Sequence, residues 1–315
     1  MARAERMVFS PDDEWQIGAT ARLCKGAGVT MACRIVSAAL VFFCISASVA
    51  AAPQRVVSTN LCTDEYVFRL AERGHIAALS FEAGDRHPVV STIAGKVRGI
   101  PQIRPSAETV LNYRPDLVVM FAGTLPRLRA VLDDLHVPVL EVPYDDSLAA
   151  IRRTTSRLGE ALGARERAAA LLARMDGELA AARRAAPRPS VRTLIYEPNG
   201  YATSGPVTEE LMAIAGLADA APGYAPTRSG RIPVEEVIAA APELLIYSGQ
   251  QDVADARANL VLHHPALAAL GGRTYAAWNP LVPLLCAGPW SADVAPVFAA
   301  LGRKARSLAP APRRP

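Results

Sequence analysis

Short apolar runs alternate with longer amphipathic stretches along most of the chain. A helix is predicted to open at Thr63 or Asp64, where a capping residue precedes apolar positions at helical spacing. Strands that alternate with helices are typical of a parallel or mixed sheet covered on both faces. Runs that predict strands occupy residues 55–58, 76–80, 116–121 and 137–142, and later 191–197, 243–247 and 273–276.

The segment 147–186 separates these two sets of strands. It contains few glycines, and its apolar residues recur every three or four positions, which predicts one long helix with a kink near Leu162 and Gly163. The Pro-rich stretch that follows ends this helix. We therefore expect an α/β protein with two Rossmann-like α/β lobes, residues 53–146 and 190–305, joined by one long helix at 147–186.

One sequence unit occurs once in each predicted lobe. Glu108 lies seven positions before Pro115, and Glu235 lies seven positions before Pro242. In both places an acidic residue follows the proline and an apolar strand comes next. Proline ends a helix because it has no N–H and crowds the preceding turn. The pattern predicts the same helix–turn–strand unit in both lobes.

Composition excludes several classes of protein and partner. The 315 residues are 51% hydrophobic and 20% charged, which is typical of globular rather than disordered or fibrous chains. The net charge of +4 comes largely from scattered arginines, so we expect no nucleic-acid partner. The five cysteines form no C-x-x-C pair and have no histidine at ligand spacing, so the sequence predicts neither a zinc site nor a thioredoxin-like motif. We expect no metal site and no resident cofactor.

The N-terminal segment predicts export to the periplasm. Residues 31–50 combine a short basic start, an apolar core and a small-residue end, the three parts of a cleavable signal peptide. Cleavage before Ala51 fits best, and cleavage before Pro53 is the second choice. A lipoprotein anchored at Cys44 and a buried hydrophobic helix are weaker alternatives.

Two consequences follow from this interpretation. Met31 becomes the true start, so residues 1–30 are a non-native N-terminal extension, while residues 306–315 form a disordered tail. Export leaves only Cys62 and Cys286 in an oxidising compartment. Each follows a strand of its own lobe, so a disulfide between them would join the lobes, and two buried thiols are the alternative.

Three blocks of the chain carry a family resemblance. In order they read R-V-V-S-T-N-L-C-T-D-E-Y, S-A-E-T-V-L-N-Y-R-P-D-L-V-V and R-I-P-V-E-E-V-I-A-A-A-P-E-L-L-I-Y. Their order and spacing resemble the periplasmic substrate-binding proteins of ABC importers for iron-siderophores and cobalamin. The resemblance spans residues 53–305 and implies the two-lobed class III fold, in which a single helix bridges the lobes and the ligand lies in the cleft between them.

The resemblance also implies a function. It predicts a monomeric solute-binding protein that captures a corrinoid, haem or iron-siderophore-like metal chelate and delivers it to a membrane permease dimer. In the resembled family an acidic residue in each lobe meets arginines of the two membrane subunits, and Glu108 and Glu235 match that pattern. We expect no enzyme activity, because the sequence contains neither a nucleophile elbow nor a Gly-rich phosphate loop. A metal-ion-binding protein or an enzyme on the same two-lobed scaffold is the alternative.

Candidate ligand-binding residues follow from topology. In open α/β sheets, ligands gather at the carboxyl ends of the strands. Aromatic side chains there could pack on a flat ligand, and arginine could meet carboxylates or phosphates. Loop packing is the alternative role for each candidate, and Trp290 is the one that we favour most. The candidates are Asn60, Phe81, His87, Thr124, Tyr201, Tyr224, Arg231, Trp278 and Trp290.

Overall fold

The computed structural model describes residues 51–84, 90–202, 205–221, 230–249 and 257–308. These residues all belong to one compact unit, Ala51–Pro315. None of the described helices is long and apolar enough to cross a membrane.

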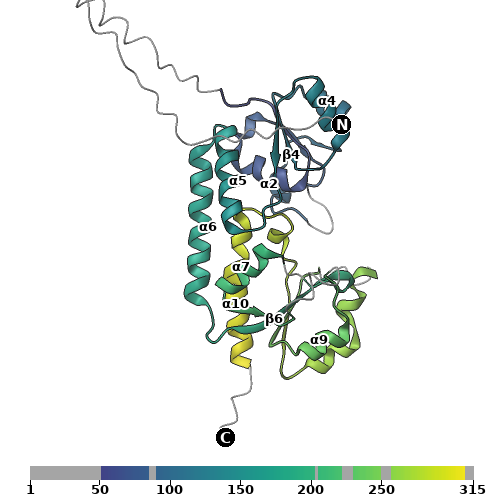
Figure 1. The fold of residues 1–315 in the computed structure, drawn as a ribbon, viewed down its shortest axis with the longest axis vertical. Helices are drawn as coiled ribbons and strands as arrows, with labels where there is room; N and C mark the ends of the chain where they lie inside the picture. The colour runs from purple at the N-terminus through teal and green to yellow at the C-terminus, as the bar shows by residue number, and fades with distance from the viewer. Residues whose placement is uncertain (1–50, 85–89, 203–204, 222–229, 250–256, 309–315) are drawn as a thin grey trace, which may run out of the picture. The chain divides into compact units, whose positions relative to one another are not determined.

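The N-terminal lobe is built on a parallel five-stranded sheet with the strand order β3-β2-β1-β4-β5 (Figure 1). Because successive strand residues point to opposite faces, Val56 packs with α2 while Val57 packs with α4 on the other side. Helices therefore cover both faces of the sheet. The strands are β1 (Val56–Ser58), β2 (Ile76–Ser80), β3 (Gln102–Ile103), β4 (Leu117–Phe121) and β5 (Val139–Val142), and the helices are α2 (Leu61–Leu70), α3 (Ala107–Leu111) and α4 (Pro126–Asp134).

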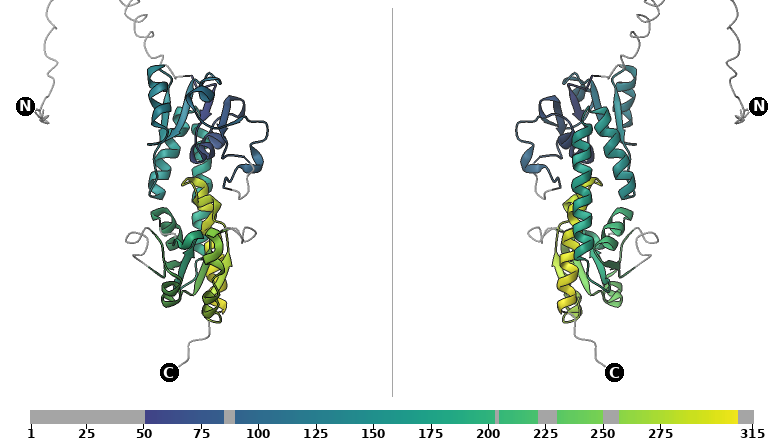
Figure 2. Two further views of the ribbon diagram at one scale, coloured as in Figure 1. Left: turned by 90° about the vertical axis from the view of Figure 1, so that its right-hand side faces the viewer. Right: turned by 90° about the vertical axis from the view of Figure 1, so that its left-hand side faces the viewer.

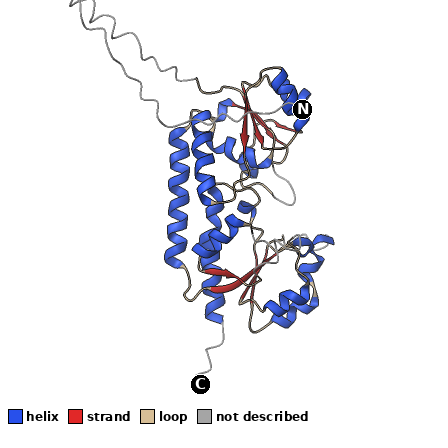
Figure 3. Ribbon diagram, viewed as in Figure 1, coloured by secondary structure: helices blue, strands red, loops and turns tan. Residues whose placement is uncertain are grey.

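The C-terminal lobe repeats this plan with a second sheet, whose strands are drawn red in Figure 3. This sheet is parallel and four-stranded, with the order β7-β6-β8-β9. Ile195 faces a core shared with α7 and α10, and its neighbour Leu194 faces the core that contains α9. The strands are β6 (Val191–Tyr196), β7 (Leu217–Asp219), β8 (Leu244–Tyr247) and β9 (Tyr275–Trp278), and the helices are α7 (Pro206–Ile214), α9 (Val234–Ala240) and α10 (Val294–Leu308). Short 3-10 helices in the two lobes are η1 (Arg73–His75), η2 (Ala94–Lys96), η3 (Pro198–Gly200), η5 (Arg257–His263), η6 (Pro265–Leu270), η7 (Val282–Leu284) and η8 (Pro289–Asp293).

The repeated helix–turn–strand unit is present in both lobes. Helix α3 leads through Pro115 into β4, and α9 leads through Pro242 into β8. Each of these strands pairs with the first strand of its lobe, β1 or β6. The acidic residue after the proline holds that first strand: Asp116 accepts hydrogen bonds from the backbone N–H groups of Gln54 and Arg55, and Glu243 accepts one from Arg192 N–H.

The prediction of one continuous helix over residues 147–186 is wrong. The chain forms two helices, α5 (Leu148–Ala161) and α6 (Arg165–Ala185). Between them Gly163 adopts a left-handed backbone conformation with φ +63°. Glycine in this conformation is a common helix terminator because it has no Cβ to clash, so what the sequence suggested as a kink is a full reversal of the chain.

Helices α5 and α6 run antiparallel and lie side by side (Figure 2). Gly159 faces Ala168 beside the turn, and Arg152 bonds Asp176 farther from it. The approach near the turn is close, since a Cβ added at Gly159 would lie 2.4 Å from the Ala168 Cβ. Helix α5 also packs into both cores, through Ile151 on one side and Leu158 on the other, and the chain passes to the C-terminal lobe through α6.

Helix α6 contributes to the hydrophobic cores of both lobes. Ala168, in its first turn, belongs to the N-terminal core. Met175 and Leu179, farther along the same helix, belong to the C-terminal core together with Phe298 of α10. One helix thus packs against both lobes, which is the bridging role that the sequence assigned to the whole segment.

The core position of Phe298 predicts a large loss of stability on truncation. Its side chain is 0% exposed, and we expect Phe298→Ala to lower the free energy of unfolding by about 3–5 kcal/mol because it leaves a cavity. The neighbouring Val297 is 37% exposed and serves as the control, since Val297→Ala should change stability by less than about 0.5 kcal/mol. Urea unfolding of both variants measures this, and equal losses would contradict the packing described for α10.

Candidate ligand-binding site

The carboxyl ends of the parallel strands bring most of the predicted binding residues to the sheet edge of each lobe. Asn60, Phe81 and Thr124 follow β1, β2 and β4 in the N-terminal lobe. Tyr201 follows β6, and Trp278 is the last residue of β9. His87 and Tyr224 lie outside the described residues. The topology thus clusters three candidates in one lobe and two in the other.

An arginine covers an aromatic ring at the N-terminal sheet edge. The guanidinium of Arg104, which follows the short strand β3, lies 4.1 Å from the ring centroid of Phe81. Arg104 is exposed and Phe81 is partly buried. A guanidinium held over an aromatic face keeps its N–H donors available for a carboxylate or another anionic group. Arg104 is not among the residues predicted from the sequence to bind a ligand.

The C-terminal lobe has a second pair of the same kind. Arg231 forms an isolated antiparallel bridge with Tyr201, and its guanidinium lies 5.0 Å from the tyrosine ring centroid. Arg104 precedes Glu108 by four residues, and Arg231 precedes Glu235 by the same interval. The repeated unit therefore begins at an arginine in both lobes, and this shared spacing is the signal that could have found Arg104.

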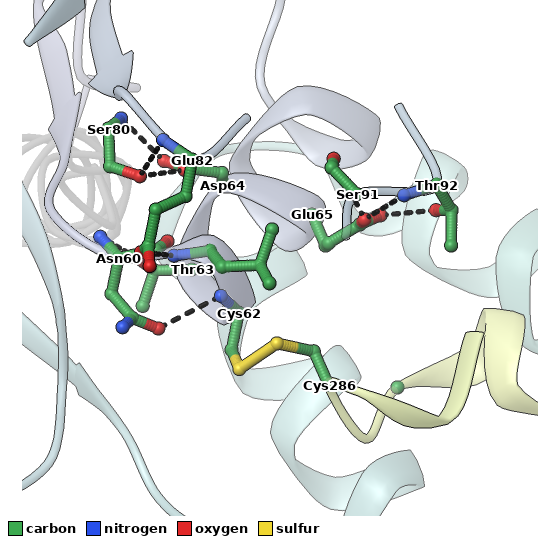
Figure 4. The surroundings of a disulfide bond; sticks show 12 residues. Asn60, Cys62, Thr63, Asp64, Glu65, Ser80, Glu82, Ser91, Thr92 and Cys286 are labelled. Atoms are coloured by element: carbon green, nitrogen blue, oxygen red, sulfur yellow. Dashed lines mark hydrogen bonds between the residues drawn. A yellow bond between two sulfur atoms is a disulfide. The ribbon is translucent and has the colours of Figure 1, made fainter. Parts of the chain in front are cut away.

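The first turn of α2 is tightly organised (Figure 4). Asn60 caps the helix, with its Oδ1 accepting a hydrogen bond of 2.9 Å from Cys62 N–H. The carboxylate of Glu82 accepts one of 3.1 Å from Leu61 N–H. These bonds tie the loop after β1 to the loop after β2. Asn60 Oδ1 is thus engaged in capping, and any contact of this residue with a ligand stays a prediction.

Asp64 is a buried carboxyl group one turn into this helix. Ser80 donates to it from both its backbone N–H and its hydroxyl. Burial nevertheless raises the pKa of Asp64 to about 7, because the hydrogen bonds from Ser58 and Ser80 only partly offset the loss of water, and the nearby Glu82 adds to the rise. Asp64 consequently changes its charge near neutral pH.

Three aromatic rings meet around Trp278. It lies 5.1 Å from the His263 ring in a stacked arrangement and 4.9 Å from the Tyr247 ring, centroid to centroid. Its side chain stays partly exposed, so a role in ligand binding remains a prediction. In the other lobe, the Thr124 hydroxyl donates to Phe121 O at 2.6 Å and closes the turn after β4.

The prediction that Trp290 contacts the ligand is wrong in this structure. Trp290 is only 2% exposed. Its ring packs edge-on against Tyr66 with 4.8 Å between centroids, and its Nε1 donates to Cys286 O at 2.9 Å. The chain folds inward here as η8, which begins at Pro289. Trp290 is a contact between the lobes rather than a platform for a ligand.

Cys62 and Cys286 form a disulfide in the structure (Figure 4). Their Cα atoms lie 5.0 Å apart, inside the usual range, and the bond links α2 of the first lobe to the segment before η8. The cysteines are 224 positions apart, and a closed loop of that length stabilises the fold by about 5 kcal/mol in the chain-entropy account.

Other predicted residues lie at exposed positions. Glu108 and Glu235 are each the second residue of their helix, α3 and α9, and both side chains are exposed. His264 caps η6 through its Nδ1, which accepts a hydrogen bond from Ala266 N–H. Among the described residues, no group of three His, Cys, Asp or Glu side chains could hold a metal ion.

The chain matches a known protein family and is similar in fold to solved structures. Residues 56–271 match the family described as periplasmic binding protein. The haem-binding protein BhuT in complex with two haems is 21% identical, with a TM-score of 0.63 over 82% of this chain and 100% of that chain. The haem-binding protein RhuT from Roseiflexus sp. RS-1 is 23% identical, with a TM-score of 0.60 over 80% and 98% of the two chains.

A vitamin B12-binding protein has the same fold. BtuF of Vibrio cholerae is 15% identical, with a TM-score of 0.57 over 81% of this chain and 98% of that chain. At these identities the likeness to solved structures shows the fold alone. No curated protein matches the chain.

The raised pKa of Asp64 predicts a specific pH dependence of stability. The unfolded carboxyl ionises near pH 4, whereas the folded one ionises near pH 7. The folded state therefore holds a proton on Asp64 that the unfolded state has already lost between these pH values. The stabilisation that this proton gives to the folded state is full below about pH 4 and is lost as the pH rises through about 7. Relative to Asp64→Asn, the wild-type free energy of unfolding should fall by up to about 4 kcal/mol between pH 4 and pH 8.

Urea unfolding at several pH values measures this difference. The exposed Asp134 provides the control, because Asp134→Asn should differ from wild type by a constant amount over the same range. A constant difference for Asp64→Asn as well would contradict the burial of its charge.

The disulfide predicts the number of free thiols. Because Cys62 and Cys286 are the only cysteines after residue 50, denatured but unreduced protein that begins at Ala51 should react with no thiol reagent. After reduction it should react at two sites. Maleimide labelling followed by intact-mass measurement decides this, and two thiols before reduction would rule the bond out.

Proposed function

This chain belongs to the periplasmic binding protein family, and we propose that it is the solute-binding component of an ABC importer. It captures a cobalamin-, haem- or iron-siderophore-like ligand between its two lobes and delivers it to the membrane permease. The chemistry is binding and docking, with no bond made or broken. Nothing in the described residues favours the metal-ion or enzyme alternative.

The two arginine–aromatic pairs carry this proposal. Arg104 over Phe81 and Arg231 over Tyr201 present one cation and one flat apolar face at the sheet edge of each lobe. A large ligand with a conjugated ring system and anionic groups complements both features. Haem and catecholate chelates have this chemistry, and corrinoids combine a flat macrocycle with a phosphate. The haem- and B12-binding proteins that share this fold support the same ligand classes.

The ligand that the native protein carries tests this proposal. We expect protein purified from the host periplasm to carry an organic ligand with visible absorbance, since corrinoids, haem and ferric chelates are all coloured. Native mass spectrometry gives the ligand mass, and N-terminal sequencing of the same sample should begin at or near Ala51. Cytoplasmic protein that keeps residues 1–50 would contradict export, and a metal without organic mass would favour the metal-binding alternative.

Two variants test the site at the same time. Arg104→Ala and Arg231→Ala should each weaken ligand affinity about tenfold or more, because each removes a charge-assisted contact. Arg98, another exposed arginine of the N-terminal lobe, provides a control, because Arg98→Ala should leave affinity unchanged. Wild-type affinity in both site variants would move the ligand away from these sheet edges.

The permease contact is assigned to Glu108 and Glu235. Both are exposed at the second position of equivalent helices, where the helix dipole favours a negative charge. Two matched negative points suit a partner with two-fold symmetry, because each lobe can make the same contact with one subunit. Asp116, a neighbouring acid, is already bonded to the backbone of Gln54 and Arg55 and is less available for a partner.

Charge reversal tests docking separately from binding. Glu108→Lys combined with Glu235→Lys should abolish importer-dependent uptake while ligand affinity stays near wild type. Glu236→Lys is the matched control, since this acid is exposed on the same helix and has no counterpart in the first lobe's repeated unit. Unchanged uptake in the double variant would contradict the docking assignment, and a large loss of affinity would place the two residues in the binding site.

A further inference from the structure

One face of α2 makes a junction with the second lobe. Cys62, Tyr66 and Arg69 are spaced by four and three residues, so they lie along one side of the helix. Cys62 is bonded to Cys286, and Tyr66 packs on Trp290. The Arg69 guanidinium lies 4.5 Å from the Trp290 ring centroid. Three successive side chains thus hold the segment 286–290, and we call this set of contacts the α2 junction.

The non-covalent half of the α2 junction is braced within the first lobe. Arg69 is bonded to the carboxylate of Glu65, whose side chain is 2% exposed, and donates to the Thr92 hydroxyl at 2.6 Å. Glu65 also accepts a hydrogen bond of 2.6 Å from Thr92 N–H. The orientation of Arg69 is therefore fixed independently of the disulfide, whereas the link to the second lobe relies on ring contacts and one covalent bond.

The disulfide is also adjacent to the candidate binding site. Cys62 donates its backbone N–H to Asn60, and Leu61 donates to Glu82 (Figure 4). Asp64, two residues further on, accepts from Ser80 N–H at 2.9 Å. Any shift of Cys62 consequently shifts the loops after β1 and β2, which carry the N-terminal half of the site.

We propose that oxidation of Cys62 and Cys286 completes the ligand site, so that the reduced chain binds ligand weakly. This inference rests on the proposed function and adds its regulation. Before export both thiols are reduced, and the lobes meet at the α2 junction through side-chain contacts alone. After export the bond fixes the loops after β1 and β2 against the segment 286–290. Capture is thereby confined to the compartment where the ligand is collected.

The chemistry is thiol–disulfide exchange with an external disulfide oxidant. Cys62 is partly exposed and Cys286 is buried, so the thiolate of Cys62 attacks the oxidant first. A mixed disulfide forms and one thiol of the oxidant leaves. The thiolate of Cys286 then attacks the Cys62 sulfur, the second oxidant thiol leaves, and the protein has lost two electrons and two protons to the oxidant.

Haemin titration of serine variants tests the proposal. Cys62→Ser, Cys286→Ser and the double variant break the same bond, so all three should bind haemin at least tenfold more weakly than the oxidised wild type. No reductant is present, which keeps the haemin iron unaffected. Circular dichroism checks that each variant is folded. If the variants do not fold, oxidised wild type that has been reduced, alkylated and desalted replaces them.

Hydrogen exchange gives a readout that needs no ligand. Without the bond, the amides of Leu61 and Cys62 should exchange at least tenfold faster, while those around Met175 in α6 should not change. Haemin affinity equal to wild type in all variants would overturn the proposal, whatever the exchange rates. If haemin binds no form, the haem assignment under the proposed function fails, and the exchange at Leu61 and Cys62 alone decides: faster exchange supports the junction, and unchanged exchange overturns it.

Discussion

The packing of α6 into two hydrophobic cores is the constraint on which the rest of the molecule depends. Ala168 contributes to one core and Leu179 to the other, so neither lobe completes its core without this helix. An ion pair between Arg174 of α6 and Asp293 of η8, 2.8 Å long, lies along the same helix. Because α6 and its neighbour α5 pack into both cores, the two sheet edges are held in a limited set of arrangements.

Both lobes contain the same short sequence unit, which runs from an arginine through a helix and a proline into a strand. In the first lobe, Arg104 lies at the sheet edge, Glu108 lies in the first turn of α3, Pro115 follows that helix and Asp116 anchors the neighbouring strand. The second lobe repeats these roles at the same spacing except at the arginine's partner, which is tyrosine rather than phenylalanine. One stretch of sequence thus supplies a candidate ligand contact, a candidate partner contact and the strand pairing that fixes both.

The sequence predicted most strands, including the three-residue β1 within the run 55–58. It missed β3 and β7, which have two and three residues, and Arg104 was missed together with β3. Gly163 was interpreted as a kink because a glycine alone does not distinguish a bend from a reversal. Trp290 was predicted to contact the ligand because the local sequence does not show that it is buried. Its burial depends on Tyr66, a residue more than two hundred positions away.

Helices α5 and α6 approach so closely at Gly159 that only the Ala168 methyl group fits between their backbones there. A side chain at position 159 would act as a wedge, pushing apart the two helices that carry the first lobe onto the second. Position 159 thus controls the spacing of these two helices and lies apart from the candidate contacts at Arg104 and Glu108. In a redesign of this scaffold as a biosensor, substitutions at position 159 would change the spacing of α5 and α6 and leave the candidate recognition residues unchanged.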